Sequence, residues 1–158
     1  MLAMMPMYFV ACGSDDDEPM GVTSIETLYG TWQQTHGVTF EDGAFHHDND
    51  VSADEAEFLR FDKSGTCYVL GGYRGVFYDI YYKDTYFFTF NEESKNLKIG
   101  SRSLVVEVLS GGILKLKYFT YRDEYILATY KKVNDSVWDN LWFSGVKTYD
   151  PTEPYEYL

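Results

Sequence analysis

The sequence is short of basic residues and has no long apolar run, and each shortage excludes a class of function. Its 158 residues include 13 Lys and Arg against 25 Asp and Glu, which gives a formal net charge of −12. Nucleic-acid binding needs a basic surface, so we expect no nucleic-acid partner. Anionic membrane surfaces repel an acidic chain, so any attachment to a membrane must be covalent or strictly apolar. The longest apolar run is residues 2–11. It is shorter than the roughly 18 residues of a membrane-spanning helix.

Cysteine and the common catalytic motifs are also scarce. The two cysteines, Cys12 and Cys67, could form one disulfide, but Cys12 stands after an apolar leader and Cys67 inside a predicted strand. We therefore expect Cys67 to be a buried thiol. No Gly-x-Ser-x-Gly elbow, P-loop or dinucleotide-binding glycine pattern occurs. We expect a protein that is not an enzyme and has no cofactor.

Aromatic residues, by contrast, are abundant at 18% of the chain, including 15 Tyr and 11 Phe. This content favours β-structure. The periodic signal divides the chain into three zones. Residues 1–23 form a leader and an acidic linker, residues 24–133 form the folded domain, and residues 134–158 form a tail. We expect the tail to pack on the domain through an aromatic cluster that contains Trp138, Leu141, Trp142 and Phe143.

The folded zone predicts one helical turn followed by about eight short strands. Ser24 is the expected N-cap, Gly30 the expected end of the turn, and a first strand runs from Trp32 to about Phe40. The polar residues 41–56 predict a long loop with a turn of helix at its end. Further strands are expected at residues 58–62, 66–70, 76–82, 85–90, 97–100, 103–109, 113–121 and 124–133.

Glycines and alternating side chains predict how these strands connect. Hairpin turns are expected at residues 63–65 and 110–112, and a bend or bulge at Gly71 and Gly72. Period-2 alternation places Leu114, Leu116 and Tyr118 on one face of their strand, and Tyr86, Phe88 and Phe90 on one face of another. Short connections imply antiparallel neighbours. The expected fold is all-β: a single antiparallel up-and-down barrel, with a β-sandwich as the alternative.

Three segments of this zone resemble the lipocalin-like domains of Bacteroidetes cell-envelope lipoproteins. They are LYGTW at 28–32, FLRFDKSGT at 58–66 and ILATYKKV at 126–133. The resemblance covers about residues 24–133 and implies a small lipocalin-like barrel. It implies that Trp32, beside Gly30 and Leu28, packs across the closed end of that barrel. In lipocalins an arginine of the last strand often covers this tryptophan, and here the last strand offers Lys131 and Lys132.

The leader indicates how the protein is attached to a membrane. Residues 9–12, Phe-Val-Ala-Cys, match a bacterial lipobox, in which a small residue precedes the cysteine that receives the lipid. We expect Cys12 to be lipidated and to be the link to the membrane. The following acidic stretch, residues 14–18, resembles the export signal of surface lipoproteins. The expected location is the outer membrane, with the domain exposed at the cell surface. The alternatives are an incidental buried cysteine and a solvated spacer.

Two further stretches are candidate binding sites. Residues 46–50, HHDND, are the best metal-like stretch, but adjacent histidines seldom converge on one ion, so we expect a polar loop and no metal. An aromatic run could form a ligand platform or serve as barrel packing, and its members are Tyr73, Phe77, Tyr78, Tyr81 and Tyr82.

These observations favour non-catalytic binding of a small apolar molecule or a glycan inside the barrel or at its mouth. The alternative is a structural or interaction module of an envelope protein complex, with a barrel filled by its own side chains.

Overall fold

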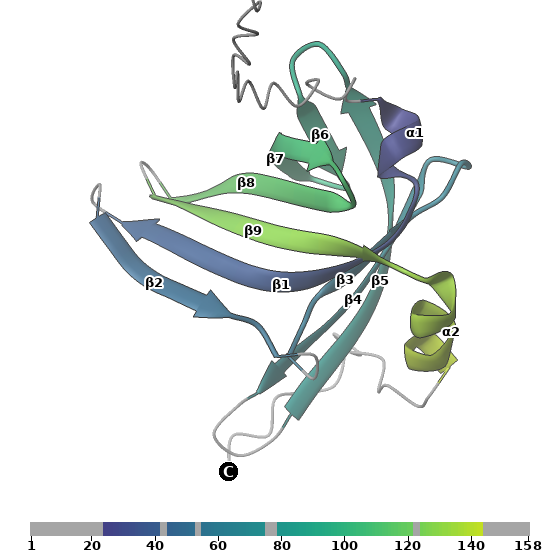
Figure 1. The fold of residues 1–158 in the computed structure, drawn as a ribbon, viewed down its shortest axis with the longest axis horizontal. Helices are drawn as coiled ribbons and strands as arrows, with labels where there is room; N and C mark the ends of the chain where they lie inside the picture. The colour runs from purple at the N-terminus through teal and green to yellow at the C-terminus, as the bar shows by residue number, and fades with distance from the viewer. Residues whose placement is uncertain (1–23, 42–43, 53–54, 75–78, 122–123, 144–158) are drawn as a thin grey trace, which may run out of the picture.

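The computed structural model describes residues 24–41, 44–52, 55–74, 79–121 and 124–143. Within these ranges the side chains of residues 45–46, 72–74, 79–82, 121 and 141–143 are not described. The described chain is mostly strand, with two short helices (Figure 1). The elements are α1 (Ile25–Leu28), β1 (Gly30–Glu41), β2 (Ala44–Asp50), β3 (Phe58–Phe61), β4 (Thr66–Arg74), β5 (Asp79–Asn91), β6 (Asn96–Ile99), β7 (Arg102–Ser110), β8 (Ile113–Tyr121), β9 (Glu124–Val133) and α2 (Asp135–Phe143).

The strands form one antiparallel sheet that closes on itself, which confirms the predicted barrel. The order is β2-β1-β3-β4-β5-β6-β7-β8-β9, and β1 also pairs with β9. Eight strands therefore form the closed barrel, and β2 is an extra strand beside β1. Closure is the expected solution for sequential antiparallel strands because it removes exposed sheet edges.

Strand β2 overturns the prediction of a long loop at residues 41–56. It pairs with the second half of β1 from His36↔Asp50 to Glu41↔Ala44. The strand is polar and largely exposed, so its sequence lacks the apolar alternation that would predict a strand. Backbone pairing and side-chain contacts with β1 hold it instead: the His36 imidazole lies 2.9 Å from a carboxylate oxygen of Asp48 and 3.0 Å from one of Asp50.

The predicted bulge at Gly71 and Gly72 is also wrong. Both residues continue β4 in register, opposite Tyr82 and Tyr81 of β5. Residues 79–91 likewise form one long strand where the pattern predicted two. The two strands pair with each other without interruption from Thr66↔Phe87 to Arg74↔Asp79, and this ladder carries β4 through its glycines and β5 through the polar residues Lys83 and Asp84.

Two predicted turns form with the expected chemistry. Gly111 and Gly112 connect β7 and β8 with φ of 57° and 77°, and Ser110 pairs with Ile113 across them. Positive φ at both central residues is what a two-residue hairpin needs. At residues 62–66, Asp62 accepts hydrogen bonds from the backbone N–H groups of Ser64 and Thr66.

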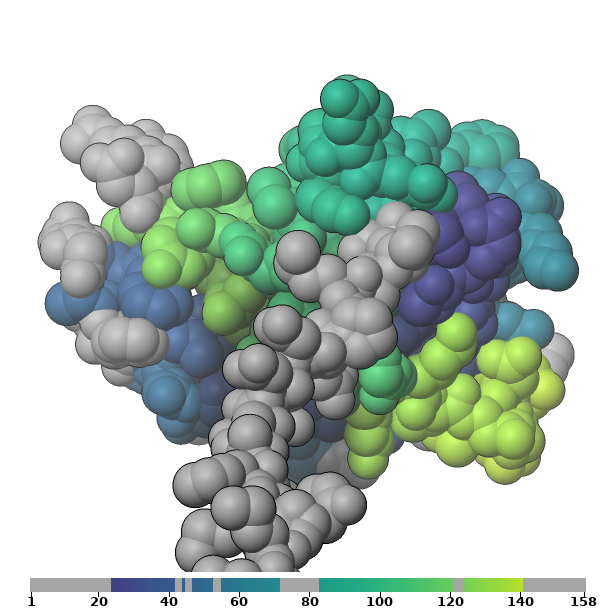
Figure 2. Space-filling model, turned by 45° about the horizontal axis from the view of Figure 1, so that its top comes forward, coloured from purple at the N-terminus to yellow at the C-terminus, as the bar shows by residue number. Residues whose placement is uncertain are grey.

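The main core lies inside the barrel, and its side chains alternate as predicted. Leu114 and Leu116 of β8 are buried with Phe88 of β5, whereas Phe87 is 83% exposed on the outer face. A second cluster lies outside the barrel wall, where Trp138 of α2 packs with Ala56, Phe58 and Leu70. Figures 1 and 2 show α1 and α2 near each other at one end of the molecule. Neither helix in the described ranges is long and apolar enough to span a bilayer.

Candidate functional site

Trp32 lies at the α1 end of the barrel and is fully buried in the main core. Its indole N–H donates a 2.7 Å hydrogen bond to the Leu28 carbonyl, so the last residue of α1 holds the ring. The Lys132 ammonium lies 5.2 Å from the centroid of this ring. Gly30, with φ of +113°, leaves the space for the lysine, because a Cβ there would lie 3.0 Å from Lys132 Cε.

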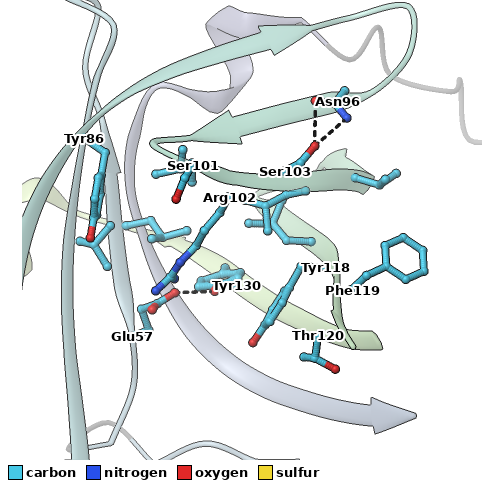
Figure 3. Close-up of a pocket in the computed structure, with 16 residues that line it drawn as sticks. Glu57, Tyr86, Asn96, Ser101, Arg102, Ser103, Tyr118, Phe119, Thr120 and Tyr130 are labelled. Atoms are coloured by element: carbon cyan, nitrogen blue, oxygen red, sulfur yellow. Dashed lines mark hydrogen bonds between the residues drawn. The ribbon is translucent and has the colours of Figure 1, made fainter. Parts of the chain in front are cut away.

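A cavity of about 930 Å³ lies inside the barrel (Figure 3). It exists because β6 has only four residues and covers only Phe88–Asn91 of the long strand β5. Among the described residues, Asp79–Phe87 of β5 pair only with β4, and the end of β8 after Lys117 pairs only with β9. The wall between β5 and β8 is therefore not continuous, and the cavity opens to solvent beside the exposed Phe119 and Thr120.

One part of the cavity wall is apolar. Its side chains come from five strands and are almost completely buried. They are Leu59, Val69, Ile99, Leu104 and Leu116. These residues point inward because successive side chains of a strand alternate between the two faces of the sheet. The volume falls in the range of small-molecule pockets in proteins, roughly 300–1,000 Å³.

The other part of the wall is polar. The Tyr130 hydroxyl donates a 2.9 Å hydrogen bond to Glu57, which stands just before β3. Figure 3 shows the Arg102 side chain reaching from β7 toward Glu57 and Tyr130, with Tyr118 beside the same space. Glu57 and Arg102 are the two charged residues among the described lining residues.

Two tyrosine hydroxyls of the wall have a raised pKa. Burial raises the pKa of Tyr118, the charge of Glu57 raises it further, and the charge of Arg102 opposes them. Burial also raises the pKa of Tyr86, together with a 3.0 Å hydrogen bond from its hydroxyl to Asp84. A neutral phenol both donates and accepts hydrogen bonds, so these groups can orient a polar head group.

The turn between β6 and β7 positions Tyr86. Gly100 has φ of +58°, and a Cβ there would lie 2.7 Å from Cδ1 of the Tyr86 ring. The Gly100 N–H donates to the carbonyl of Phe87, which ties the turn to β5. Glycine is therefore needed for the close packing of this turn on the tyrosine at the cavity mouth.

The lipidation site and the aromatic run singled out in the sequence lie wholly or partly outside the described part of the structure. Cys12, Phe77 and Tyr78 are not described, and for Tyr73, Tyr81 and Tyr82 only the backbone is. That backbone places Tyr73 in β4, and Tyr81 and Tyr82 in β5. Cys67 is a free, buried thiol, as expected, and burial raises its pKa.

The residues of the metal-like stretch, 46–50, make different kinds of contact. Asp48 and Asp50 contact opposite nitrogens of the His36 ring, and His47 pairs with Thr39 in the β1–β2 ladder. His46 is known only by its backbone. Within the described residues, no three His, Cys, Asp or Glu side chains are arranged to hold a metal ion.

The polar residues of the cavity were missed in the sequence, although part of the signal was present. Tyr118 and Tyr86 continue the inward faces of Leu114–Leu116 and Phe88–Phe90, so alternation alone places them inside the barrel. Glu57 and Arg102 carry no such signal. Glu57 ends a polar stretch and Arg102 begins a strand, and only the closed sheet brings them into one cavity.

Comparison of the chain with protein-family models and with curated proteins finds no match.

Proposed function

We propose that this protein binds one small, largely apolar molecule with a polar end in the barrel cavity, without catalysis. The observation that carries the proposal is a cavity of about 930 Å³ with an apolar wall and a polar cluster around Glu57. Apolar walls with a few placed polar groups are typical of small-molecule sites. The alternative of a barrel filled by its own side chains fits a cavity of this size poorly.

The polar cluster supports binding more than hydrolysis. Glu57 is the single carboxylate among the described lining residues, and it is engaged by the Tyr130 hydroxyl. Glycoside hydrolysis uses a pair of carboxylates, one acting as acid and the other as nucleophile or base. The apolar wall likewise favours a hydrocarbon-rich ligand over a glycan, since sugars need hydrogen-bond partners on most sides.

Binding of an uncharged apolar fluorophore, N-phenyl-1-naphthylamine, tests the proposal. We expect saturable binding at a single site, and a loss of about tenfold or more in affinity for Val69→Phe, which fills the apolar wall. The matched control is Thr85→Phe, which adds the same ring at an exposed position of β5. Absence of saturable binding, or equal affinity in both variants, would contradict the proposal. Mass spectrometry of co-purified material would identify the natural ligand.

We also propose that lipidation of Cys12 attaches the protein to the outer membrane, with the barrel displayed at the cell surface. The support is the Phe-Val-Ala-Cys sequence at residues 9–12 and the acidic residues that follow it. Labelled palmitate should enter the protein in cells, and Cys12→Ser should abolish both the label and the membrane association. Incorporation of label into Cys12→Ser would show that this cysteine is not the attachment site.

A further inference from the structure

The charges that face the cavity cancel. One carboxylate, Glu57, and one guanidinium, Arg102, line it among the described residues, and the remaining polar lining groups are hydroxyls and an amide. Burial raises the pKa of the Tyr118 and Tyr86 hydroxyls further above neutral pH. The cavity thus offers donors and acceptors without a net charge. The chain as a whole carries a formal charge of −12, which repels anions as they approach.

The two charges do not act equally at each position of the cavity. Glu57 is half-buried whereas Arg102 is exposed, so water screens the guanidinium more than the carboxylate. The raised pKa of Tyr118, caused by burial and then by the charge of Glu57, agrees with a negative charge being disfavoured there. Tyr118 follows Leu116 on the inward face of β8, so it lies where the apolar wall meets the polar cluster. That junction is where the head group of a bound amphiphile would lie.

We infer that the cavity selects uncharged amphiphiles, whose head group both donates and accepts hydrogen bonds, over anionic amphiphiles with the same hydrocarbon chain. The inference rests on the proposed function and names its ligand class. The hydrocarbon chain would lie along Leu59, Val69 and Leu116. A hydroxyl or carbonyl of the head would accept from Arg102 or Tyr118, and a hydroxyl would donate to Glu57. A carboxylate head supplies only acceptors and is repelled by Glu57.

The discrimination between uncharged and anionic amphiphiles depends on one side chain, Glu57, which the hydrogen bond from Tyr130 holds in place. This hydrogen bond is 2.9 Å long, and Glu57→Gln preserves an acceptor for the tyrosine while removing the charge. The variant therefore changes the electrostatics of the cavity with little change in its shape.

The test uses the full-length protein and compares two competitors of N-phenyl-1-naphthylamine, 1-monolauroylglycerol and laurate, which carry the same acyl chain. At about pH 8 laurate is ionised. In the wild type we expect monolauroylglycerol to compete about tenfold more strongly than laurate. In Glu57→Gln we expect laurate to gain about three- to tenfold in affinity, so the preference for monolauroylglycerol over laurate should shrink accordingly.

Glu93→Gln is the matched control, because it removes one negative charge from the exposed turn between β5 and β6 and should leave the ratio of the two affinities unchanged. The inference is overturned if laurate binds the wild type as tightly as monolauroylglycerol, or if Glu57→Gln leaves the ratio unchanged. The ratio is measured within one protein, so partial unfolding of a variant does not affect it. If neither competitor nor the fluorophore binds, the proposed function itself fails.

Discussion

The ammonium group of Lys132 lies over the indole ring of Trp32, 5.2 Å from its centroid. The same nitrogen donates a 3.1 Å hydrogen bond to the carbonyl of Thr27. One side chain of the last strand therefore joins the first strand and α1 at the end of the barrel where β1 and β9 close the sheet. A cation over a tryptophan face is stabilised by the ring quadrupole, here in addition to the hydrogen bond.

Replacing Lys132 with Met should lower the free energy of unfolding by about 0.5–1 kcal/mol, because it removes the cation–π contact and the hydrogen bond while keeping an apolar stem. Lys132→Arg should retain most of the stability, since a guanidinium can also cover the ring. Urea denaturation provides the measurement. Lys131→Met, at the neighbouring exposed position, is the control. Equal losses in both Met variants would show that the contact with Trp32 contributes nothing specific.

Replacing Gly30 with Ala should cost about 1–3 kcal/mol of stability. The backbone at this residue has φ of +113°, and the added Cβ would meet Lys132 Cε at 3.0 Å. Gly37→Ala is a suitable control, because Gly37 has no positive φ and its nearest contact is 3.5 Å. In the Lys132→Ala background the steric part of the cost should disappear and the backbone part remain. A single Gly30→Ala variant as stable as the wild type would refute the assignment.

Replacing Trp138 with Ala should destabilise the protein by about 3–5 kcal/mol, as for other large buried aromatics. Trp138 is 3% exposed and packs against Phe58 and Leu70 on the outer face of β3 and β4. Val137 is the control, since it lies on the same helix and is 36% exposed, so Val137→Ala should cost little. Chemical denaturation would compare the two, and a loss below about 1 kcal/mol for Trp138→Ala would mean that α2 contributes little to the fold.

The Asp62 turn should make stability depend on pH. The hydrogen bond from the Ser64 hydroxyl is the main cause that lowers the pKa of Asp62 below its ordinary value of 3.8, and partial burial opposes it. A lowered pKa in the folded state adds stability above pH 3.8, which is lost as the pH falls through the folded value. Since the carboxylate is largely exposed, we expect Asp62→Asn to cost only about 1 kcal/mol near neutral pH.

The measurement compares urea denaturation of wild type and Asp62→Asn at about pH 6 and about pH 2.5, and the difference should shrink at the lower pH. Glu93→Gln, in an exposed turn, controls for the loss of one charge. A difference that stays constant between the two pH values would mean that ionisation of Asp62 does not stabilise the turn.

Replacing Gly100 with Ala should disturb the cavity mouth. The added Cβ would lie 2.7 Å from the Tyr86 ring, and φ is +58°, so we expect a loss of more than about 1 kcal/mol and a several-fold change in affinity for N-phenyl-1-naphthylamine. Combining it with Tyr86→Leu should relieve the contact and leave the backbone strain. If Gly100→Ala binds the fluorophore as the wild type does, the position of Tyr86 does not control access to the cavity.

Local patterns predicted the strands and faces of this protein well because they depend on neighbours in the chain. The alternation of Leu114, Leu116 and Tyr118 is a direct consequence of strand geometry, and the Gly111–Gly112 hairpin follows from the freedom of glycine at positive φ. Strand β2 escaped prediction for the opposite reason. Its pairing partner is β1, its carboxylates contact His36 of that strand, and its own residues show no apolar period.

The candidate site shows the same difference between features set by neighbours in the chain and features set by distant residues. Apolar residues that line the cavity, such as Val69 and Leu116, were expected on inward faces, but no pattern indicated that the interior would be hollow. The cavity depends on the short β6, which leaves part of the wall between β5 and β8 unpaired in the described structure. Its polar groups come from positions as distant as Glu57 and Tyr130, and the sheet must close before they meet.

The amino-acid sequence by itself determined the strand-rich class, the antiparallel connections and the inward faces, since these follow from side-chain alternation, short turns and glycine. It also contains the Cys12 motif that predicts a lipid anchor. Only the tertiary structure decided that β1 pairs with β9, that Lys132 covers Trp32, and that Glu57 and Arg102 face one cavity. Those features are contacts between residues far apart in the chain, and they exist only once the barrel has closed.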